Sequence, residues 1–142
     1  MTSPKAIRDQ IISLLTTAAP KNGDGKGIVK IFKGEPPKNR WPGFPWAWVE
    51  WSGGLMEPPV GSKAEIRDSF FIVVVDKHIE AEKAEDSIMD FADSVEAALD
   101  DSPTIGGLVA YSWVVNREKQ KVFLDDYSVC ALRITLSTRR RE

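Results

Sequence analysis

The chain has 142 residues, of which 42% are hydrophobic and 28% charged, and its formal net charge is −2. This length suits one domain, and the composition excludes both a disordered chain and a strongly basic nucleic-acid binder. The longest apolar run, residues 70–75, is far shorter than the roughly 20 residues of a membrane-spanning helix, and no basic stretch with an apolar signal segment begins the chain. We therefore expect one soluble, intracellular domain over residues 1–142 that contacts no membrane.

The N-terminal segment predicts a helix followed by a short strand. Ser3 and Pro4 suit the N-cap and first-turn positions of a helix that runs to about Ala19. After the glycine-rich turn, residues 28–32 alternate weakly and predict a short strand. The apolar face of the helix consists of Ile7, Ile11, Leu14 and Leu15.

A proline-rich loop and a tryptophan-rich strand come next. Four prolines in residues 34–45 exclude a regular helix or a central strand and predict an extended loop. Residues 46–51, WAWVEW, form a strand candidate, and we expect Gly53 and Gly54 to close it with a turn.

The middle of the chain predicts a buried strand and an acidic amphipathic helix. Residues 66–76 carry apolar side chains on both faces, which indicates a strand covered on both sides. From about Glu80 to Leu99 the period becomes helical. Nine acidic residues lie between Glu80 and Asp101, with Lys83 as the one basic residue among them. The apolar stripe of this helix consists of Ile88, Phe91, Ala92, Val95 and Leu99.

The C-terminal part predicts two more strands. Residues 108–115 form one strand candidate, residues 116–121 a polar, hairpin-like excursion, and residues 127–137 an alternating strand. The order is α-β-β-β-α-β-β. This order predicts an α+β domain in which a mainly antiparallel sheet of four or five strands is covered by the amphipathic helix.

Candidate catalytic groups are few. His78 is the only histidine, and Asp76 could orient it, but no nucleophile motif accompanies the pair. We expect a solvated surface histidine at position 78 and a small core hydrophobe at Cys130. The acidic pairs and glycine-rich turns match no metal or phosphate motif. The sequence therefore predicts no enzyme, cofactor or metal site.

Four of the five tryptophans lie within residues 40–51, RWPGFPWAWVEW. On a strand, Trp46 and Trp48 share one face, whereas Trp51 lies on the other. The rings could fill the core, form a subunit interface, or make a platform on which Trp41, Phe44 and Trp46 bind sugar or a proline-rich peptide. The sequence leaves these three destinations open.

The order of the elements resembles the tail-terminator and tail-completion (head-tail joining) proteins of long-tailed bacteriophages. The likeness runs through nearly the whole chain, and TIGG after the acidic helix is its most suggestive piece. The stretches that carry it are FPWAWVEW, EIRDSFFIVVVD, ALDDSPTIGGLV, AYSWVV, NREKQKVFLDD and YSVCALRITLS.

The resemblance implies a fold related to that of the tail-terminator and tail-tube proteins. It also implies a structural virion protein of the tail or neck region, assembled in the bacterial host cytoplasm. Such a protein forms a homo-oligomer, a hexameric ring, that caps the tail tube, stops its polymerisation and joins the tail to the head connector. Its partners are then the tail-tube protein and the connector or neck protein. Another neck, head-closure or tail-completion role is the alternative within the same fold.

Two further expectations follow for such a ring. Prolines stiffen the loop over residues 34–45, so docking it on a neighbouring subunit loses little conformational freedom. We therefore expect a subunit interface formed by Arg40, Trp41, Phe44 and Trp46. DNA should pass through the ring without specific binding, apart from a salt-sensitive contribution of Arg139 to Arg141.

Overall fold

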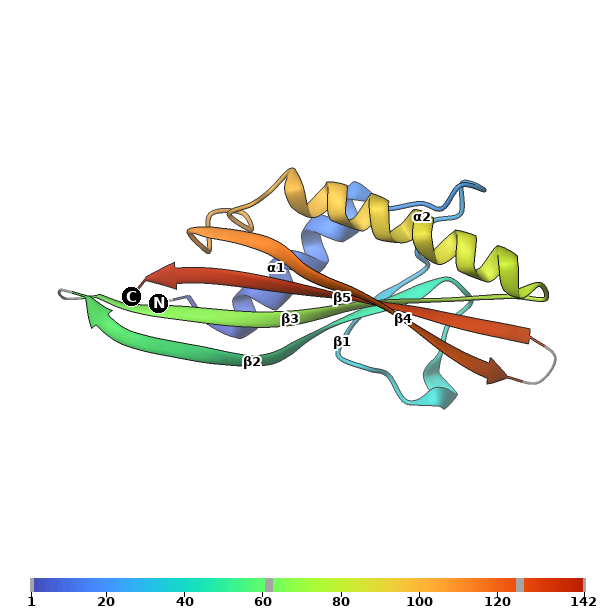
Figure 1. Cartoon of the computed structure of the whole chain (residues 1–142), viewed down its shortest axis with the longest axis horizontal. Coiled ribbons are helices and arrows are strands. Elements are labelled where there is room, and N and C mark those ends of the chain that lie inside the picture. The colour runs from blue at the N-terminus through green and yellow to red at the C-terminus, as the bar shows by residue number, and fades with distance from the viewer. Residues whose placement is uncertain (1, 61–62, 125–126, 142) are drawn as a thin grey trace.

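The computed structural model describes residues 2–60, 63–124 and 127–141 and shows an α+β domain. One five-stranded sheet has the strand order β1-β2-β3-β5-β4, and only the β1–β2 pair is parallel. Figure 1 shows the two termini close together at the end of the sheet where β2 meets β3. The predicted fold class and element order are confirmed. The elements are α1 (Pro4–Ala18), β1 (Ile31–Lys33), the 3-10 helix η1 (Lys38–Arg40), β2 (Trp46–Val60), β3 (Lys63–His78), α2 (Ala81–Asp100), β4 (Tyr111–Leu124) and β5 (Tyr127–Arg141).

Helix α1 begins and ends as its sequence predicts. The Oγ of Ser3 accepts a hydrogen bond from the backbone N–H of Ala6 at 3.1 Å, which satisfies one of the unpaired donors of the first turn. Pro4 lies in the first turn, where its missing N–H has no cost. Ala19 adopts a left-handed conformation with φ of 49° and donates its N–H to the carbonyl of Leu15, which ends the helix.

Strand β2 does not stop at Gly53 and Gly54, so the prediction of a turn there is wrong. The strand continues to Val60 alongside β3, with a register shift between Trp51 and Gly53. A β-bulge adds a residue without ending the ladder, and Gly53 has a φ of 128°, a value that side chains disfavour. The glycines therefore mark a bulge in a long strand.

The predicted polar excursion over residues 116–121 is also wrong, because these residues belong to β4. The guanidinium of Arg117 pairs with Asp93 at 3.2 Å and with Glu96, both on α2. Lys119 pairs with Glu85 at 3.2 Å. The charged half of β4 thus lies beside the acidic helix, and its side chains supply the basic partners that the helix itself lacks.

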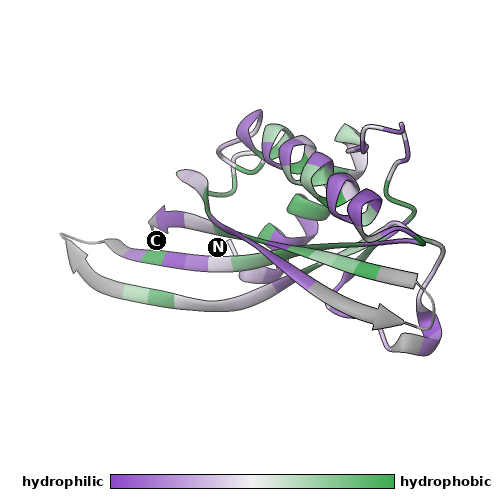
Figure 2. Cartoon of the chain, turned by 45° about the vertical axis from the view of Figure 1, so that its right-hand side comes forward, coloured by the Kyte–Doolittle hydropathy of each residue, from purple (hydrophilic) through white to green (hydrophobic). Residues whose placement is uncertain are grey.

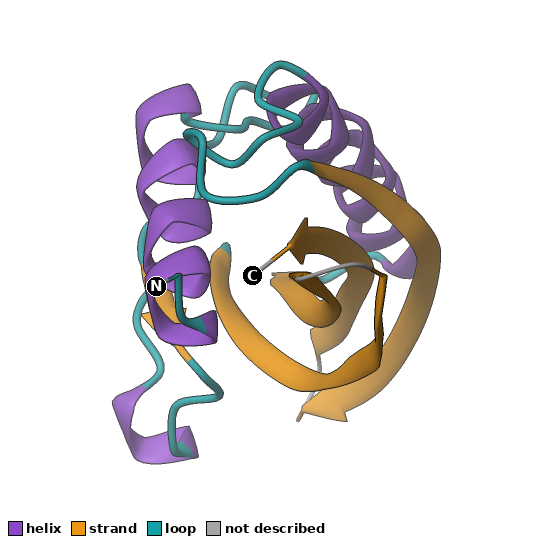
Figure 3. Ribbon diagram, turned by 90° about the vertical axis from the view of Figure 1, so that its left-hand side faces the viewer, coloured by secondary structure: helices purple, strands orange, loops and turns teal. Residues whose placement is uncertain are grey.

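The main core lies between the sheet and the two helices. Helix α1 packs against β1 and β2, whereas α2 packs against β3, β5 and β4. Figure 3, viewed along the strands, shows the sheet strongly curled, with the helices along different parts of it. Figure 2 shows hydrophilic residues along the outer side of α2. The predicted apolar stripe is buried, as is Cys130: Ile88, Phe91, Ala92, Val95 and Leu99 all belong to this core.

Candidate assembly surfaces

Strand β2 is buried on both faces at its beginning, which accounts for two of the five tryptophans. Ala47 and Val49 face the helices and join the main core. Trp46 and Trp48 face the opposite way and are buried in a second cluster. We call this the tryptophan cluster; its buried members are Trp46, Trp48, Val73, Val75, Val129 and Ala131, with Phe32, Trp41, Phe44 and Phe71 packed around them.

The proline-rich loop, residues 34–45, folds back over this cluster. The ring of Trp41 lies 5.1 Å from that of Trp46 and 6.2 Å from that of Phe44, the latter pair in an edge-to-face arrangement. Trp46 stacks on Trp48 at 5.4 Å. Hydrogen bonds from Gly34 N–H to the carbonyl of Val49 and from Val29 N–H to the carbonyl of Pro45 anchor the loop's two ends. The loop is therefore held by its own chain in one conformation.

The four predicted interface residues differ in how far they are exposed. Arg40 is exposed, Trp41 and Phe44 are partly buried, and Trp46 is fully buried beneath them. Trp46 packs under the Trp41 ring of the loop and has no exposed surface that a neighbouring subunit could contact. A subunit contact through Arg40, Trp41 and Phe44 stays a prediction.

A hollow of about 460 Å³ lies between this loop and β1. Its lining is mixed: three prolines and a phenylalanine contribute apolar surface, and three basic residues and one acidic residue contribute charge. We call it the proline hollow; it is lined by Lys30, Phe32, Lys33, Gly34, Glu35, Pro36, Pro37, Arg40 and Pro42.

A second aromatic surface, to which the sequence analysis gave no role, lies at the other edge of the sheet. On β4, Tyr111, Trp113 and Val115 are 40%, 39% and 57% exposed, and we call them the aromatic ridge. The rings of Tyr111 and Trp113 stack at 5.2 Å. The guanidinium of Arg139 lies 5.5 Å from the Tyr111 ring, and its Nη1 donates to the Tyr111 hydroxyl at 2.5 Å. Tyr and Trp two residues apart share a face of a strand, which was the signal available in AYSWVV.

The C-terminal end of α2 lies near the start of the ridge. The hydroxyl of Ser112 donates to the carbonyl of Pro103 at 2.9 Å, which fixes the segment after the helix against β4. Asp100 and Asp101 are exposed there, and the last turn of α2 has no basic residue. Because a helix C-terminus itself carries partial negative charge, this end of the molecule is strongly negative.

His78 is not the solvated surface histidine that the sequence predicted, since its side chain is only 16% exposed. Its Nε2 lies 3.3 Å from Oδ2 of the buried Asp76, so the contact that the sequence left as a possibility is present. The Ser87 hydroxyl donates to the same carboxylate at 2.5 Å and accepts from Asn22 Nδ2 at 2.9 Å. These bonds join β3, α2 and the turn after α1, and they fix the Asp76 carboxylate that His78 faces.

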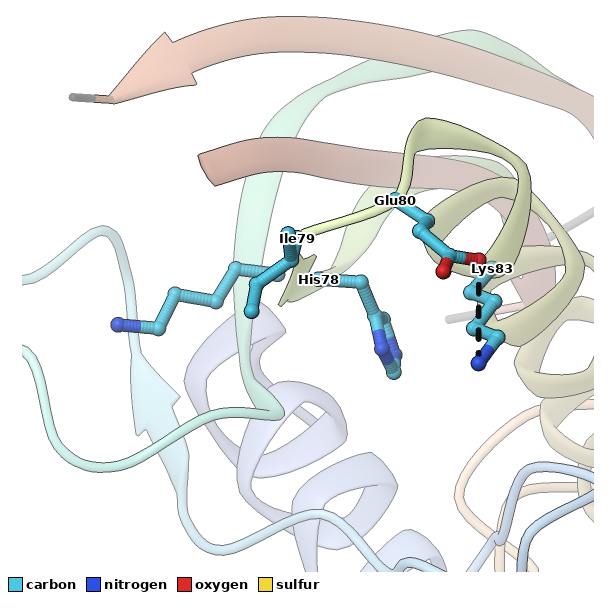
Figure 4. A pocket seen from close by; sticks show the side chains of 5 residues that line it. His78, Ile79, Glu80 and Lys83 are labelled. Atoms are coloured by element: carbon cyan, nitrogen blue, oxygen red, sulfur yellow. Dashed lines mark ion pairs between the residues drawn. The ribbon is translucent and has the colours of Figure 1, made fainter. Parts of the chain in front are cut away.

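This network does not have the order of a nucleophile-activating triad. The hydroxyl of a catalytic serine donates its hydrogen bond to an imidazole, whereas the Ser87 hydroxyl donates to the Asp76 carboxylate. His78 lines an open pocket of about 380 Å³ with Lys77, Ile79, Glu80 and Lys83. Figure 4 shows Glu80 and Lys83 at its rim, where they form an exposed ion pair at 3.8 Å. We assign this network a structural role.

We expect duplex DNA to bind this protein weakly and with a steep loss as salt rises. Arg139 pairs with Glu65, and Arg140 pairs with Asp68, so these two guanidinium groups already have carboxylate partners. Fluorescence anisotropy of a labelled duplex between low and physiological salt measures the effect. Salt-resistant, sequence-specific binding would contradict this expectation.

The described residues also bear on metal sites and membrane-spanning helices. Over residues 2–60, 63–124 and 127–141, no group of three or more His, Cys, Asp or Glu side chains is placed to hold a metal ion. In the same part of the chain, neither helix has the length and hydropathy needed to span a bilayer.

Comparison with known proteins gives distant matches among solved structures only. No family model matches the chain, and no curated protein matches it. A solved structure described as "Virion of native gene transfer agent (GTA) particle" aligns over 97% of this chain and 95% of that chain, with 14% identity and a TM-score of 0.44. A TM-score of this size does not establish a common fold, so the function must be argued from the surfaces of the chain itself.

Proposed function

We propose that this chain is a structural virion protein, a phage tail terminator that forms a ring on the tail tube, stops its polymerisation and joins the tail to the head connector. The observation that carries the ring is the placement of two different surfaces at opposite edges of one sheet. The proline-rich loop covers the β1 edge, and the acidic helix with the aromatic ridge flanks the β4 edge. Contacts between unlike surfaces are heterologous, and they close into a ring when the rotation between subunits permits.

The charges at these two edges are complementary. Lys30 and Arg40 are exposed at the loop edge. At the other edge Asp100 and Asp101 are exposed, and Asp93 is 80% exposed despite its contact with Arg117. Electrostatic complementarity speeds encounter and fixes the register of the partners. Arg40 of one copy is then suited to pair with a carboxylate of the next copy.

The phage role within this proposal rests on the sequence resemblance, which spans nearly the whole chain. The tail tube and the head connector are the partners that this role requires. Neck, head-closure and tail-completion proteins share the layout, so the position of the ring in a particle separates these alternatives.

The geometry gives less support to a sugar or peptide platform at Trp41, Phe44 and Trp46. A platform needs ring faces that are open to the ligand, whereas these three rings pack against one another. The same packing determines what replacing both Trp41 and Phe44 by alanine would do. That double variant would uncover Trp46 and destabilise the subunit, so a loss of rings in it would not isolate the interface.

Reversing the charge of Arg40 is the sharper test. We expect Arg40→Glu to weaken ring formation at least about tenfold, because it places like charges at the contact. Unfolding should be unchanged, since the side chain is exposed. Sedimentation velocity over a concentration series measures assembly, and electron microscopy of phage carrying the variant should show tails of abnormal length or particles without tails.

Lys26→Glu is the matched control. It makes the same charge change at an exposed position on the turn after α1, away from the loop. It should assemble like the wild type. Rings of native strength in Arg40→Glu, or equal losses in both variants, would contradict a specific role of the loop in the interface.

A further inference from the structure

We propose that the aromatic ridge of one copy inserts into the proline hollow of the next copy. This inference rests on the proposed ring and names the surface that receives the loop edge. The occupant of the hollow is a second copy of this chain, through Tyr111 and Trp113.

The ridge is the least protected part of an edge strand. Within the described residues, β4 pairs only with β5, so its outer backbone edge has no strand partner. Soluble proteins usually protect such an edge with charged side chains. Arg117 and Lys119 do this for the second half of β4, but the first half carries exposed Tyr111 and Trp113 instead. Large apolar side chains gathered at one edge mark an interaction site.

The ridge also has the composition of an interface centre. Tyr, Trp and Arg are the residues most enriched where binding energy concentrates. Here Tyr111 and Trp113 stack on each other, and Arg139 holds Tyr111 through its hydroxyl. The two rings are thus fixed before any partner binds, which lowers the entropy lost on docking.

The proline hollow fits an aromatic occupant. Pro36, Pro37 and Pro42 line it together with the Phe32 ring. Contact between proline rings and aromatic rings is the basis of proline-rich peptide recognition. The loop is already ordered by the packing of Trp41 on Trp46, so both sides of the contact are rigid before they meet.

Charge selects this pairing over contact between two identical edges. The hollow is lined by three basic residues, Lys30, Lys33 and Arg40, against one acidic residue, Glu35. The start of the ridge lies near Asp100 and Asp101, and Arg139 beside the ridge is already paired with Glu65. Two hollows facing each other would bring basic groups together, and two ridges would bring acidic ones together. Only the contact of ridge with hollow joins opposite charges, and because β1 and β4 are opposite edges of the sheet it repeats head to tail.

Cysteine cross-linking tests the contact directly. We would place Glu35→Cys at the hollow and Val115→Cys at the ridge, both at exposed positions. The natural Cys130 is buried, so the wild-type protein under the same oxidation gives the background level of cross-linking. A disulfide requires Cα atoms within about 7 Å, so mild oxidation should link copies into a ladder up to the full ring only if hollow and ridge meet.

The single variants are the controls. In a head-to-tail ring, neither Glu35→Cys nor Val115→Cys alone brings two new thiols together, so neither should form dimers. Dimers of Val115→Cys alone would show that two ridges meet and would overturn the proposal.

Truncating a ridge side chain to alanine tests the same contact through the strength of assembly. Trp113→Ala should weaken assembly at least about tenfold while leaving thermal unfolding close to the wild type, because the side chain is partly exposed. Ile79→Ala removes an equally apolar, exposed side chain that belongs to neither surface and should assemble normally.

The outcomes separate this inference from the proposed function. If the wild type forms rings but the double cysteine variant gives no ladder and Trp113→Ala assembles normally, the inference is wrong and the ring stands. If Trp113→Ala forms normal rings but no longer binds tail tubes, the ridge receives another tail component and the inference is wrong. A wild-type protein that stays monomeric would overturn both.

Discussion

Replacing Phe91 by alanine should lower the free energy of unfolding by about 3–5 kcal/mol. Phe91 lies on the sheet-facing side of α2 and is fully buried in the main core. Its removal loses the transfer free energy of the ring and leaves a cavity, because helix and sheet close the space only partly. Urea denaturation of the two proteins, analysed with a common slope, measures the difference.

Met89→Ala on the same helix is the control for that change. Met89 is 52% exposed and should contribute less than about 1 kcal/mol. Equal losses in the two variants, or a loss below about 1 kcal/mol for Phe91→Ala, would mean that α2 presents a different face to the sheet.

The second large effect is expected at the buried ion pair between Asp68 and Arg140. Their side chains are 2% and 9% exposed, and Nε of Arg140 lies 3.2 Å from Oδ2 of Asp68. Trp51 Nε1 donates to the other carboxylate oxygen at 3.1 Å, and the Arg140 guanidinium also donates to the carbonyl of Thr2. Arg140→Met should destabilise the fold by about 3–5 kcal/mol, because it leaves the Asp68 carboxylate buried without its cation.

Two further variants make this expectation specific. Adding Asp68→Leu to Arg140→Met should restore part of the lost stability, since an apolar pair of similar size avoids the buried charge. Lys119→Met breaks the exposed pair with Glu85 and should cost less than about 1 kcal/mol. If Arg140→Met costs no more than Lys119→Met, the pair is not held in a buried, low-dielectric site.

Local periodicity predicted the helices and the strands that are buried on both faces of the sheet. Ile7, Ile11 and Leu15 repeat at helical spacing and are buried as expected. In β5, the Cys130 and Leu132 face joins the main core, and the Val129 and Ala131 face joins the tryptophan cluster, in agreement with the predicted alternation. These features depend on residues close together in the chain.

Features that depend on distant residues were not predictable in the same way. Gly53 and Gly54 indicate a turn in isolation, but the ladder with β3 carries the strand through them. From the sequence alone, Arg117 and Lys119 indicate a loop, because their carboxylate partners lie far away in the chain, on α2. The inward position of His78 depends on Asp76, and that carboxylate is fixed by a serine on α2.

The sequence indicated where a candidate interface could lie, but not how its residues pack. The density of prolines and tryptophans drew attention to residues 40–46, but alternation alone could not show that the loop folds back and buries Trp46. The ridge was missed because a Tyr and a Trp on a strand usually pack inward. Whether they are exposed depends on how far the helices and the loop cover the sheet.

Native mass spectrometry of the purified wild-type protein across a range of concentrations tests the ring most directly. A closed head-to-tail ring predicts one dominant oligomer of fixed copy number, six, with no growth beyond it as concentration rises. A monomer at all concentrations, a dimer built from two identical surfaces, or an open series of ever larger assemblies would contradict it.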